Sequence, residues 1–328
     1  MQLLDTGELL DMMQEPNAAD AGSRSVLGVD LRSQSFADDQ AETIRRWLMQ
    51  QPVPIVGLVD EGNSLAAGLD LAVESESECE AILDNINNNP MATAVLVQVT
   101  RVTEGLPISA ALTMESLGYA TLQSGAEFER WRVGYKKSKP SGDPLELFEP
   151  VLLERKGREL NIILNTPQNR NALSVPMRDG LSEAFKLVAM DDSIAQVVVS
   201  GNGPCFSAGG DLTEFGSASD LSVAHQIRQL RMPAQYLAAH AEKYTVNLHG
   251  ACIGAGIEMT AFAGRVRATG DTFFQLPEIA MGLIPGAGGC VSIPRRIGRQ
   301  RTNYLAISGK QLSVQDALSW GLIDEIID

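Results

Sequence analysis

The sequence predicts an α/β fold, because short apolar runs alternate with segments of helical periodicity and glycine-rich turns separate them. Residues 196–200 form such a run and end in the turn Gly201-Asn-Gly-Pro204. A largely helical stretch over 221–241 follows, and residues 245–248 are the next strand. This alternation is typical of strands joined by right-handed crossover connections.

The individual elements follow from the same two periodicities. Residues 151–164 read as two strands joined at Lys156-Gly157, and residues 174–190 read as a helix with Ser174 at its N-cap. Its apolar positions recur at helical spacing: Met177, Leu181, Phe185 and Val188. Earlier in the chain the signals predict helices over 41–50 and 77–86 and strands over 53–59 and 92–99.

Composition indicates two modules of different charge. Residues 1–150 hold 24 acidic and 10 basic side chains, whereas the rest of the chain holds 17 and 16. The stretch Tyr135-Lys-Lys-Ser-Lys-Pro-Ser-Gly-Asp-Pro144 is polar and carries two prolines, which favours a linker. We therefore expect an acidic N-terminal α/β domain over 1–134, a linker over 135–148 and a second domain over 149–328.

Several classes of protein are disfavoured. No basic stripe is present, so we expect no nucleic-acid partner. No run of about 18 apolar residues exists and the N-terminus lacks a signal-peptide pattern, so we expect no membrane association and a cytoplasmic location. The four cysteines lack metal-ligand spacing, so we expect reduced thiols and no metal.

An internal duplication is one interpretation of the N-terminal module. Residues 62–72 can be laid over 250–260, which places Asp70 on Glu258, and residues 82–99 echo 186–200 as helix, turn and strand. The N-terminal domain would then be a degenerate repeat of the C-terminal one. The alternative is that any two α/β segments look alike at this level.

Chemistry is concentrated in two segments about twenty residues apart. His249-Gly-Ala-Cys-Ile-Gly-Ala-Gly-Ile-Glu258 is a glycine-rich turn entering a helix, where N–H groups and the helix dipole favour an anion. A second turn of small residues, Phe206-Ser-Ala-Gly-Gly-Asp211, lets a ligand approach the backbone, so N–H groups from both turns can form an oxyanion hole. Taken alone, the position of Glu258 is better explained by favourable charge–dipole placement than by catalysis.

The second carboxylate lies in Gln275-Leu-Pro-Glu278-Ile-Ala-Met-Gly-Leu-Ile-Pro-Gly-Ala-Gly-Gly289. Pro277 fixes the backbone before Glu278, and the apolar residues after it should raise the pKa of the carboxyl, as a general acid or base requires. Gly286 could present a backbone group to a water. By contrast, we expect Asp211 to fix its own loop and His249 to be structural, because no paired nucleophile is apparent.

These motifs resemble the crotonase, or enoyl-CoA hydratase/isomerase, superfamily over residues 151–328. The stretches that carry the resemblance are Leu164-Asn-Thr-Pro-Gln-Asn-Arg-Asn-Ala-Leu-Ser174, Cys205-Phe-Ser-Ala-Gly-Gly-Asp-Leu212, the two segments quoted above, and Ala317-Leu-Ser-Trp-Gly-Leu-Ile-Asp324. The resemblance implies a β-β-α spiral fold and an acyl-CoA substrate. It also implies no cofactor apart from the coenzyme A of the substrate, and a homotrimer or hexamer.

The resemblance also implies roles for individual residues. Glu258 and Glu278 would be the catalytic pair, which holds a water and adds it syn across the double bond of a 2-enoyl-CoA. Glu278 would deliver the proton and Glu258 would orient or activate the water. The remaining roles fall on backbone and binding positions: the oxyanion-hole N–H groups of Ala208 and Ala255, water positioning by Gly286, and CoA binding by Arg170, Ala172, Leu173 and Ser207.

Two departures from the family pattern are evident. The chain ends at Asp328, where family members continue for several helices, and about 140 residues precede the matching segment. We expect the N-terminal module to cover the C-terminal module in place of those helices. Leu276 stands where a glutamine is frequent, which hints at an apolar acyl group.

Three functions stay open at this point. The leading one is an enoyl-CoA hydratase, a lyase of fatty acid metabolism, because both glutamates are kept. A crotonase-type isomerase, or a hydrolase or lyase that cleaves a ring on an acyl-CoA, would use the same oxyanion hole. A non-catalytic acyl-CoA-binding or scaffolding subunit is the alternative of another class, and the acidic N-terminal half favours it mildly.

Overall fold

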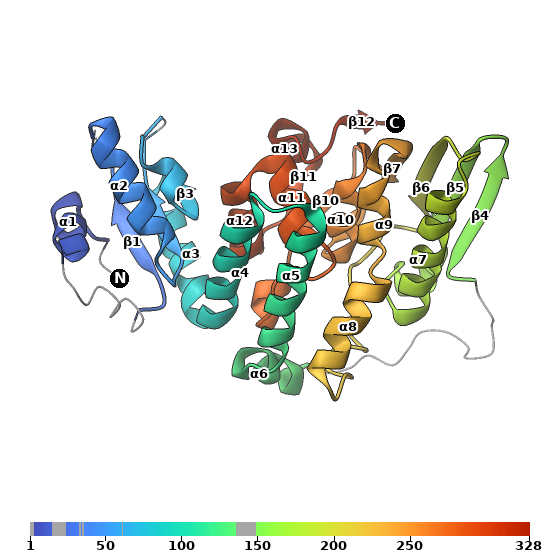
Figure 1. The fold of residues 1–328 in the computed structure, drawn as a ribbon, viewed down its shortest axis with the longest axis horizontal. Coiled ribbons are helices and arrows are strands. Elements are labelled where there is room, and N and C mark those ends of the chain that lie inside the picture. Colours follow the sequence, from blue (N-terminus) through green and yellow to red (C-terminus); the bar gives the residue numbers. More distant parts are fainter. Residues whose placement is uncertain (1–2, 15–23, 33, 35, 61, 136–148) are drawn as a thin grey trace.

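The computed structural model describes residues 3–14, 24–32, 34, 36–60, 62–135 and 149–328. A small sheet lies at one end of the molecule and the strands β4 to β6 lie at the other, with the helices α4, α5 and α8 between them (Figure 1). The linker expected over 135–148 lies, apart from Tyr135, outside the described residues.

The N-terminal sheet is parallel, with strand order β1-β2-β3. Its strands are β1 (Leu27–Asp30), β2 (Ile55–Leu58) and β3 (Leu71–Val73). The accompanying helices are α1 (Thr6–Gln14), α2 (Asp38–Met49), the 3-10 helix η2 (Ala66–Gly68) and α3 (Glu76–Asn88). Every residue of β2 is buried, as expected for a parallel strand covered on both faces. The predicted helices 41–50 and 77–86 and the strand 53–59 are confirmed.

The next segment, residues 90–135, contains three helices and no strand. They are α4 (Pro90–Thr103), α5 (Ile108–Gln123) and α6 (Ala126–Gly134). The strand predicted over 92–99 is therefore wrong, because these residues lie within α4. Their β-branched side chains favour a strand, but Ala92, Leu96, Val99 and Thr103 are buried at helical spacing against α5, α11 and α12. Pro90 in the first turn is also pre-set for a helix.

The C-terminal segment, residues 149–328, is built on a six-stranded sheet of order β12-β9-β7-β6-β5-β4. All neighbours are parallel except the hairpin of β4 and β5. The strands are β4 (Val151–Lys156), β5 (Glu159–Leu164), β6 (Gln196–Gly201), β7 (Tyr244–Leu248), β9 (Arg265–Thr269) and β12 (Glu325–Ile327). A second sheet, of order β11-β10-β8, contains β8 (Ala251–Ile253), β10 (Phe273–Gln275) and β11 (Leu312–Ser313).

Helices connect and cover these strands. The α-helices are α7 (Val175–Met190), α8 (Leu221–Arg231), α9 (Ala234–Ala239), α10 (Ala255–Glu258), α11 (Gly289–Ile297), α12 (Arg299–Ser308) and α13 (Val314–Trp320). The 3-10 helices are η3 (Pro167–Asn169), η4 (Ala241–Lys243), η5 (Thr260–Phe262) and η6 (Glu278–Met281). The predicted hairpin and helix are confirmed, and the Ser174 hydroxyl accepts the Met177 N–H as an N-cap.

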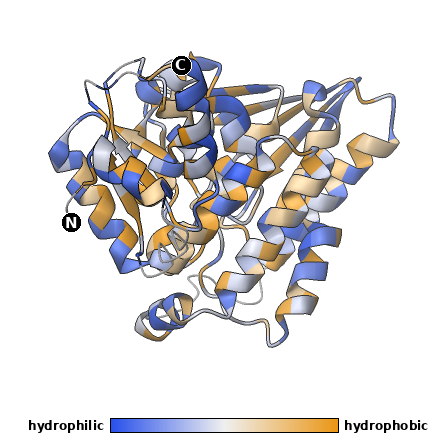
Figure 2. Ribbon diagram, turned by 60° about the vertical axis from the view of Figure 1, so that its left-hand side comes forward, coloured by the Kyte–Doolittle hydropathy of each residue, from blue (hydrophilic) through white to orange (hydrophobic). Residues whose placement is uncertain are grey.

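The helices α3 to α6 share a hydrophobic core with the C-terminal segment. One cluster of buried residues runs from Ile82 and Leu96 through Phe185 to Ile293, whereas Leu9, Ile44 and other residues of α1, α2, β1 and β2 form a smaller cluster. The helices visible in Figure 2 carry both hydrophilic and hydrophobic colours, as helices with one buried face do. A boundary at residue 134 therefore does not separate two cores.

Three N-terminal helices pack on the C-terminal segment. The helix α5 packs on α8, α9 and α11, α6 packs on η6, and α4 packs on α11 and α12. Polar contacts join the same elements: Thr100 Oγ1 donates to Asn303 Oδ1 at 3.0 Å and Thr103 Oγ1 donates to the Cys290 carbonyl at 3.1 Å. The helices α4, α5 and α6 therefore pack together with the C-terminal segment as one unit.

The duplication stays a prediction, with one of its supports removed. The order β1-β2-β3 matches the parallel order β6-β7-β9. However, residues 82–99 do not repeat the helix, turn and strand of 186–200, because 92–99 are helical.

Among the residues that the structure describes, no helix combines the length and apolar character needed to cross a membrane.

Candidate functional site

A cavity of about 580 Å³ lies where α5, α8 and the glycine-rich loops of the C-terminal segment meet. Tyr119 and Gln123 of α5 line it on one side, and Arg228 of α8 lines it on another. The loop residues that line it include Leu173, Ala255, Glu258, Glu278 and Gly286. Both predicted glutamates therefore open into one cavity.

Glu258 ends the short helix α10 and is 2% exposed. Its Oε2 accepts the backbone N–H of Ala287 at 2.7 Å and of Gly289 at 3.1 Å. Burial raises the pKa of this carboxyl to about 7, although the N–H groups stabilise its ionised form and limit the rise. Glu258 can therefore exchange a proton near neutral pH.

Glu278 begins the 3-10 helix η6, directly after Pro277, and is 8% exposed. Burial and the charge of Glu258 hold the pKa of its carboxyl well above the usual range. Its Oε2 is buried and has no hydrogen-bond partner among the described residues. An unpaired carboxyl oxygen in a cavity is available to a ligand, and the raised pKa favours its protonated form.

Gly254 brings the two carboxyls together. Its φ is +48°, in the region that favours glycine. A Cβ at this position would collide with Oε1 of Glu278 and would lie 3.7 Å from Oε1 of Glu258. Both carboxyls therefore lie beside Gly254, and the absence of a Cβ there leaves room for the Glu278 carboxyl.

The two predicted oxyanion-hole donors differ in availability. Ala255 begins α10 and lines the cavity, and its N–H has no acceptor within the described part of the chain. The N–H of Ala208, in contrast, donates to the Arg170 carbonyl at 2.9 Å. Ala255 is thus ready to bind an oxyanion, whereas Ala208 must first release or share its bond to Arg170.

Tyr119 packs directly on Gly286, the residue expected to position the water. A Cβ at Gly286 would collide with the Tyr119 ring, so glycine permits this close approach. Gly286 lines the cavity, and its role in positioning a water stays a prediction. The Arg228 guanidinium in turn lies 4.8 Å from the centre of the Tyr119 ring, which forms a cation–π contact.

A family model described as enoyl-CoA hydratase/isomerase matches residues 155–328, slightly more than half of the chain. The chain belongs to this family. The crotonase resemblance of the sequence is confirmed, and family members act on acyl-CoA substrates.

Relatives and solved structures agree with the family model. The chain is 31% identical over 176 residues to the 2,3-dehydroadipyl-CoA hydratase of Escherichia coli (strain K12), which covers 54% of the chain and 68% of that protein. It is 31% identical over 179 residues to a mitochondrial Delta(3,5)-Delta(2,4)-dienoyl-CoA isomerase of Mus musculus, covering 51% and 55%. A crystal structure of enoyl-CoA hydratase from Thermoplasma volcanium matches with 33% identity and a TM-score of 0.51, covering 55% and 73%.

The residues that the family resemblance assigned to CoA binding lie on two adjoining loops. The Leu173 N–H donates to the Gly209 carbonyl at 2.7 Å, and Leu173 lines the cavity. The Ser207 side chain is buried, and its hydroxyl donates to the Asn171 carbonyl at 2.8 Å. Arg170 is exposed and Ala172 is buried. Leu173 thus reaches the cavity, whereas the Ser207 hydroxyl is occupied within the loops.

Two further expectations concern residues outside the chemistry. Asp211 Oδ1 accepts the backbone N–H of Thr213 at 2.9 Å, so it fixes its own loop as expected, although it also lines the cavity. Nε2 of His249 lies 3.0 Å from the Gly203 carbonyl, which agrees with a structural role. The four cysteines are free and buried.

Sequence reasoning missed every site residue that precedes residue 149. Glu115, Tyr119 and Gln123 all come from α5, and Glu115 is buried with its carboxyl directed at the turn after Gly286. The signal that could have found Glu115 is a carboxylate at a helical spacing from the apolar positions Ala111 and Leu122. Arg228 was missed as well, although it lies in the predicted helical stretch 221–241.

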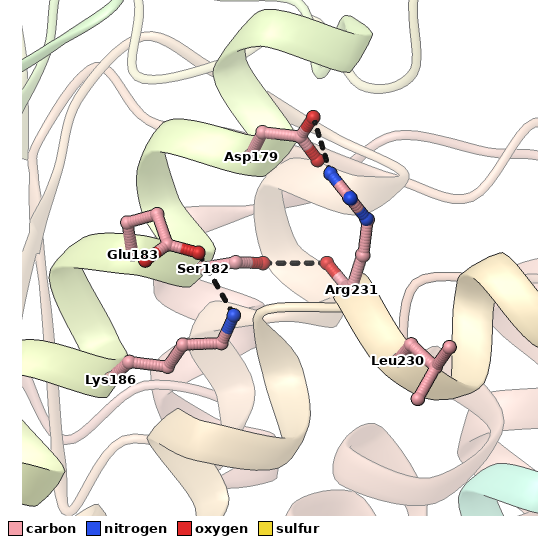
Figure 3. Close-up of a pocket in the computed structure, with 6 residues that line it drawn as sticks. All are labelled: Asp179, Ser182, Glu183, Lys186, Leu230 and Arg231. Carbon is pink, nitrogen blue, oxygen red and sulfur yellow. Dashed lines mark hydrogen bonds and ion pairs between the residues drawn. The ribbon is translucent and has the colours of Figure 1, made fainter.

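A second cavity, of about 290 Å³, lies between α7 and the end of α8 (Figure 3). Its charged side chains pair with one another: Lys186 Nζ lies 2.9 Å from Glu183 Oε1, and an Arg231 nitrogen lies 3.3 Å from Asp179 Oδ2. The Ser182 hydroxyl donates to the Arg231 carbonyl at 2.5 Å. These groups satisfy one another, so the first cavity is the candidate site.

Proposed function

We propose that the protein is an enoyl-CoA hydratase, a lyase that adds water reversibly and in syn geometry to a 2-enoyl-CoA thioester. The observation that carries the proposal is the pair Glu258 and Glu278, two buried carboxyls that both lie beside Gly254 and line one cavity. The unoccupied Ala255 N–H beside them supports a thioester oxygen at that point.

The different surroundings of the carboxyls support different roles. Glu258 accepts two backbone N–H groups, which favour its ionised form, so it takes a proton from the attacking water. Glu278 has an unpaired oxygen, and burial and the charge of Glu258 raise its pKa well above the usual range, which favours the protonated form that donates. The water oxygen bonds to the β-carbon, the Glu278 proton goes to the α-carbon, and the proton gained by Glu258 resets the pair.

The oxyanion hole stabilises the step between these proton transfers. Addition of water to the β-carbon moves negative charge onto the thioester oxygen, and a donor in a dry site stabilises that charge most. Ala255 would supply the first N–H, and Ala208 the second once the thioester oxygen replaces or shares the Arg170 carbonyl. The carboxyls and the donors would thus act on the two ends of one conjugated system.

The test is hydration of crotonyl-CoA, followed by loss of the absorbance of the conjugated thioester. We expect activity in the wild type and a fall of about a hundredfold or more in kcat for Glu258→Gln and for Glu278→Gln, because each removes one proton transfer. The control is Glu183→Gln, whose side chain is 74% exposed and outside the large cavity. Activity unchanged by both cavity substitutions would refute the assigned mechanism.

Isomerisation of a 3-enoyl-CoA is the competing reaction that the same assay series separates. It needs one carboxyl to move a proton between two carbons, so one of the two glutamine variants would keep its activity. The relatives include both hydratases and an isomerase. Isomerisation without hydration in the wild type would overturn the hydratase proposal.

The assembly and location of the protein belong to the same proposal. We propose a homotrimer or hexamer, which light scattering during size-exclusion chromatography would detect as a multiple of the 35.2 kDa chain. A monomer at all concentrations would contradict it.

The proposed cytoplasmic location would be tested by fractionation of cells that express the tagged protein.

A further inference from the structure

We propose that Glu115 of α5 is a positioning residue of this active site, which fixes the backbone turn that holds Glu258 and presents Gly286. The inference rests on the proposed function for its effect on turnover. Its structural basis, in contrast, is a set of hydrogen bonds that can be tested without turnover.

Two carboxylates share four consecutive backbone N–H groups. Glu258 accepts those of Ala287 and Gly289. Glu115 accepts the alternate ones, Gly288 to Oε1 at 2.7 Å and Cys290 to Oε2 at 2.8 Å. The turn is therefore clamped by one carboxylate from α10 and another from α5.

The turn needs this second acceptor. Ala287, Gly289 and Cys290 are buried, so an N–H left without a partner there would carry the full cost of desolvation. The turn also leads into α11, whose first N–H groups lack acceptors within the helix and carry partial positive charge. The Glu115 carboxyl suits this position because its two oxygens accept one N–H group each.

A shift of this turn would displace the reacting groups, because they contact it directly. If the Gly288 and Cys290 amides shift, the intervening N–H of Gly289 moves away from Glu258 Oε2. Gly286 lies two residues before Gly288 and packs against Tyr119, one helical turn after Glu115. A displacement of the turn would therefore move Glu258 and the predicted water position together.

The position of Glu115 is itself well fixed. It is 2% exposed, and Gly118 of the same helix packs closely on Val99 of α4 and on Ile284. The charged and titratable groups that act on it are Glu258 of α10, Arg228 of α8 and Cys290 of α11, together with Glu278 of η6 and Tyr119 of its own helix. Burial and the charge of Glu258 hold the pKa of the Glu115 carboxyl well above its usual value, and the N–H groups of Gly288 and Cys290 oppose that rise.

The experiment compares Glu115→Gln with Glu127→Gln. Glu127 is a matched control, because it too is a buried glutamate that accepts two helix N-terminal amides, Met91 at 2.8 Å and Ala92 at 2.9 Å, but at the start of α4. Amide hydrogen exchange is measured first. Glu115→Gln should accelerate exchange at Gly288 and Cys290, and Glu127→Gln should not.

Turnover is measured next, on crotonyl-CoA. Glu115→Gln should lower kcat by about tenfold to a hundredfold while KM changes by less than about twofold, as a displaced catalytic group requires. Glu127→Gln should keep the wild-type kcat and KM at temperatures where it is folded.

The outcomes separate this inference from the hydratase proposal. A wild type without hydration activity refutes the hydratase proposal, and the exchange at Gly288 and Cys290 still decides the role of Glu115. Unchanged exchange at these amides, or equal losses of kcat in both variants, overturns the role of Glu115. If Glu115→Gln does not fold, Glu115→Asp keeps the charge on a shorter side chain, and the same exchange and kcat measurements apply to it.

Discussion

Gly254 shows how strongly the site depends on single atoms. Its φ is positive, and a Cβ there would collide with the Glu278 carboxyl. We expect Gly254→Ala to lose about 1–3 kcal/mol of stability through backbone strain, and about a hundredfold in kcat through displacement of the carboxyls. Thermal unfolding and crotonyl-CoA hydration measure the two effects.

The control for this substitution is Gly105→Ala. A Cβ at Gly105 meets nothing within 4 Å, and its φ lies outside the left-handed region. Equal effects of the two substitutions on kcat would mean that contact with the carboxyls is not the reason glycine occupies position 254.

The raised pKa of Glu258 predicts a stability that depends on pH. A carboxyl whose pKa rises from 4.5 to about 7 on folding holds its proton more tightly in the folded state. The free energy of unfolding therefore falls as pH rises from about 4.5 to about 7, by roughly 3 kcal/mol for this group, and changes no further above that range. Glu258→Gln removes this dependence.

Urea denaturation at pH 5 and pH 8 tests this expectation. The stability of Glu258→Gln relative to the wild type should be greater at pH 8 than at pH 5. Glu183→Gln, on the exposed face of α7, should follow the wild type at both values. A relative stability of Glu258→Gln that is the same at both pH values contradicts a buried carboxyl that titrates near neutrality.

Residues differ in how far the sequence predicts them. Glu258 and Glu278 were predicted because each lies in a motif whose turns and spacing are local. Glu115 was not, because its partners are 173 and 175 residues away and only the folded chain brings them together. The state of Ala208 was also not predictable, because it depends on where the Arg170 carbonyl points.

The helix α4 shows that local sequence can also mispredict a whole element. The residues Val95 to Val99 have strand-like composition, yet the segment is helical because its buried positions face α5, α11 and α12. Tertiary packing thus overrode local preference. Elements whose ends carry clear signals, such as α7 with its Ser174 cap, were predicted correctly.

The helix α5 is expected to act as a fixed wall of the cavity. A Cβ at Gly118 would lie 2.9 Å from Val99 Cγ2, 3.2 Å from Val95 Cγ1 and 3.3 Å from Ile284 Cδ1. Gly118→Leu should therefore push α5 outward, cost about 1–3 kcal/mol of stability and lower hydration activity.

The matched control lies one residue earlier on the same helix. Leu117 is 45% exposed, so Leu117→Ala should change both properties little. Urea denaturation and the crotonyl-CoA assay measure them. Full activity of a stably folded Gly118→Leu would show that the close packing of α5 on α4 and Ile284 is not required by the site.

At the scale of the molecule, Asp70 ties three parts of the chain together. Its fully buried carboxylate accepts hydrogen bonds from Arg101 of α4, from Arg299 of α12 at 2.8 Å and from the Ile55 N–H at 2.8 Å. Removing the charge leaves two buried guanidinium groups without this counter-charge. We expect Asp70→Asn to cost about 3–5 kcal/mol.

The exposed pair of Asp30 and Arg32 provides the comparison. Their side chains are 31% and 41% exposed, so Asp30→Asn should cost at most about 1 kcal/mol. Urea denaturation of both variants measures the difference. A cost for Asp70→Asn no greater than that for Asp30→Asn would mean that this ion-pair network does not join the parts energetically.

The clamp between Glu115 and the turn before α11 also sets an order of events during synthesis. The ribosome releases α4 and α5 before any residue of α11 exists, so the faces that pack on α11 must wait for a partner made more than 160 residues later. Chains whose apolar surface stays exposed until its partner is made are prone to aggregate and bind chaperones. In pulse-labelled refolding we therefore expect the amides of α5 to become protected together with those of α11. If the α5 amides become protected earlier than those of α11, α5 forms its stable structure before α11 packs on it.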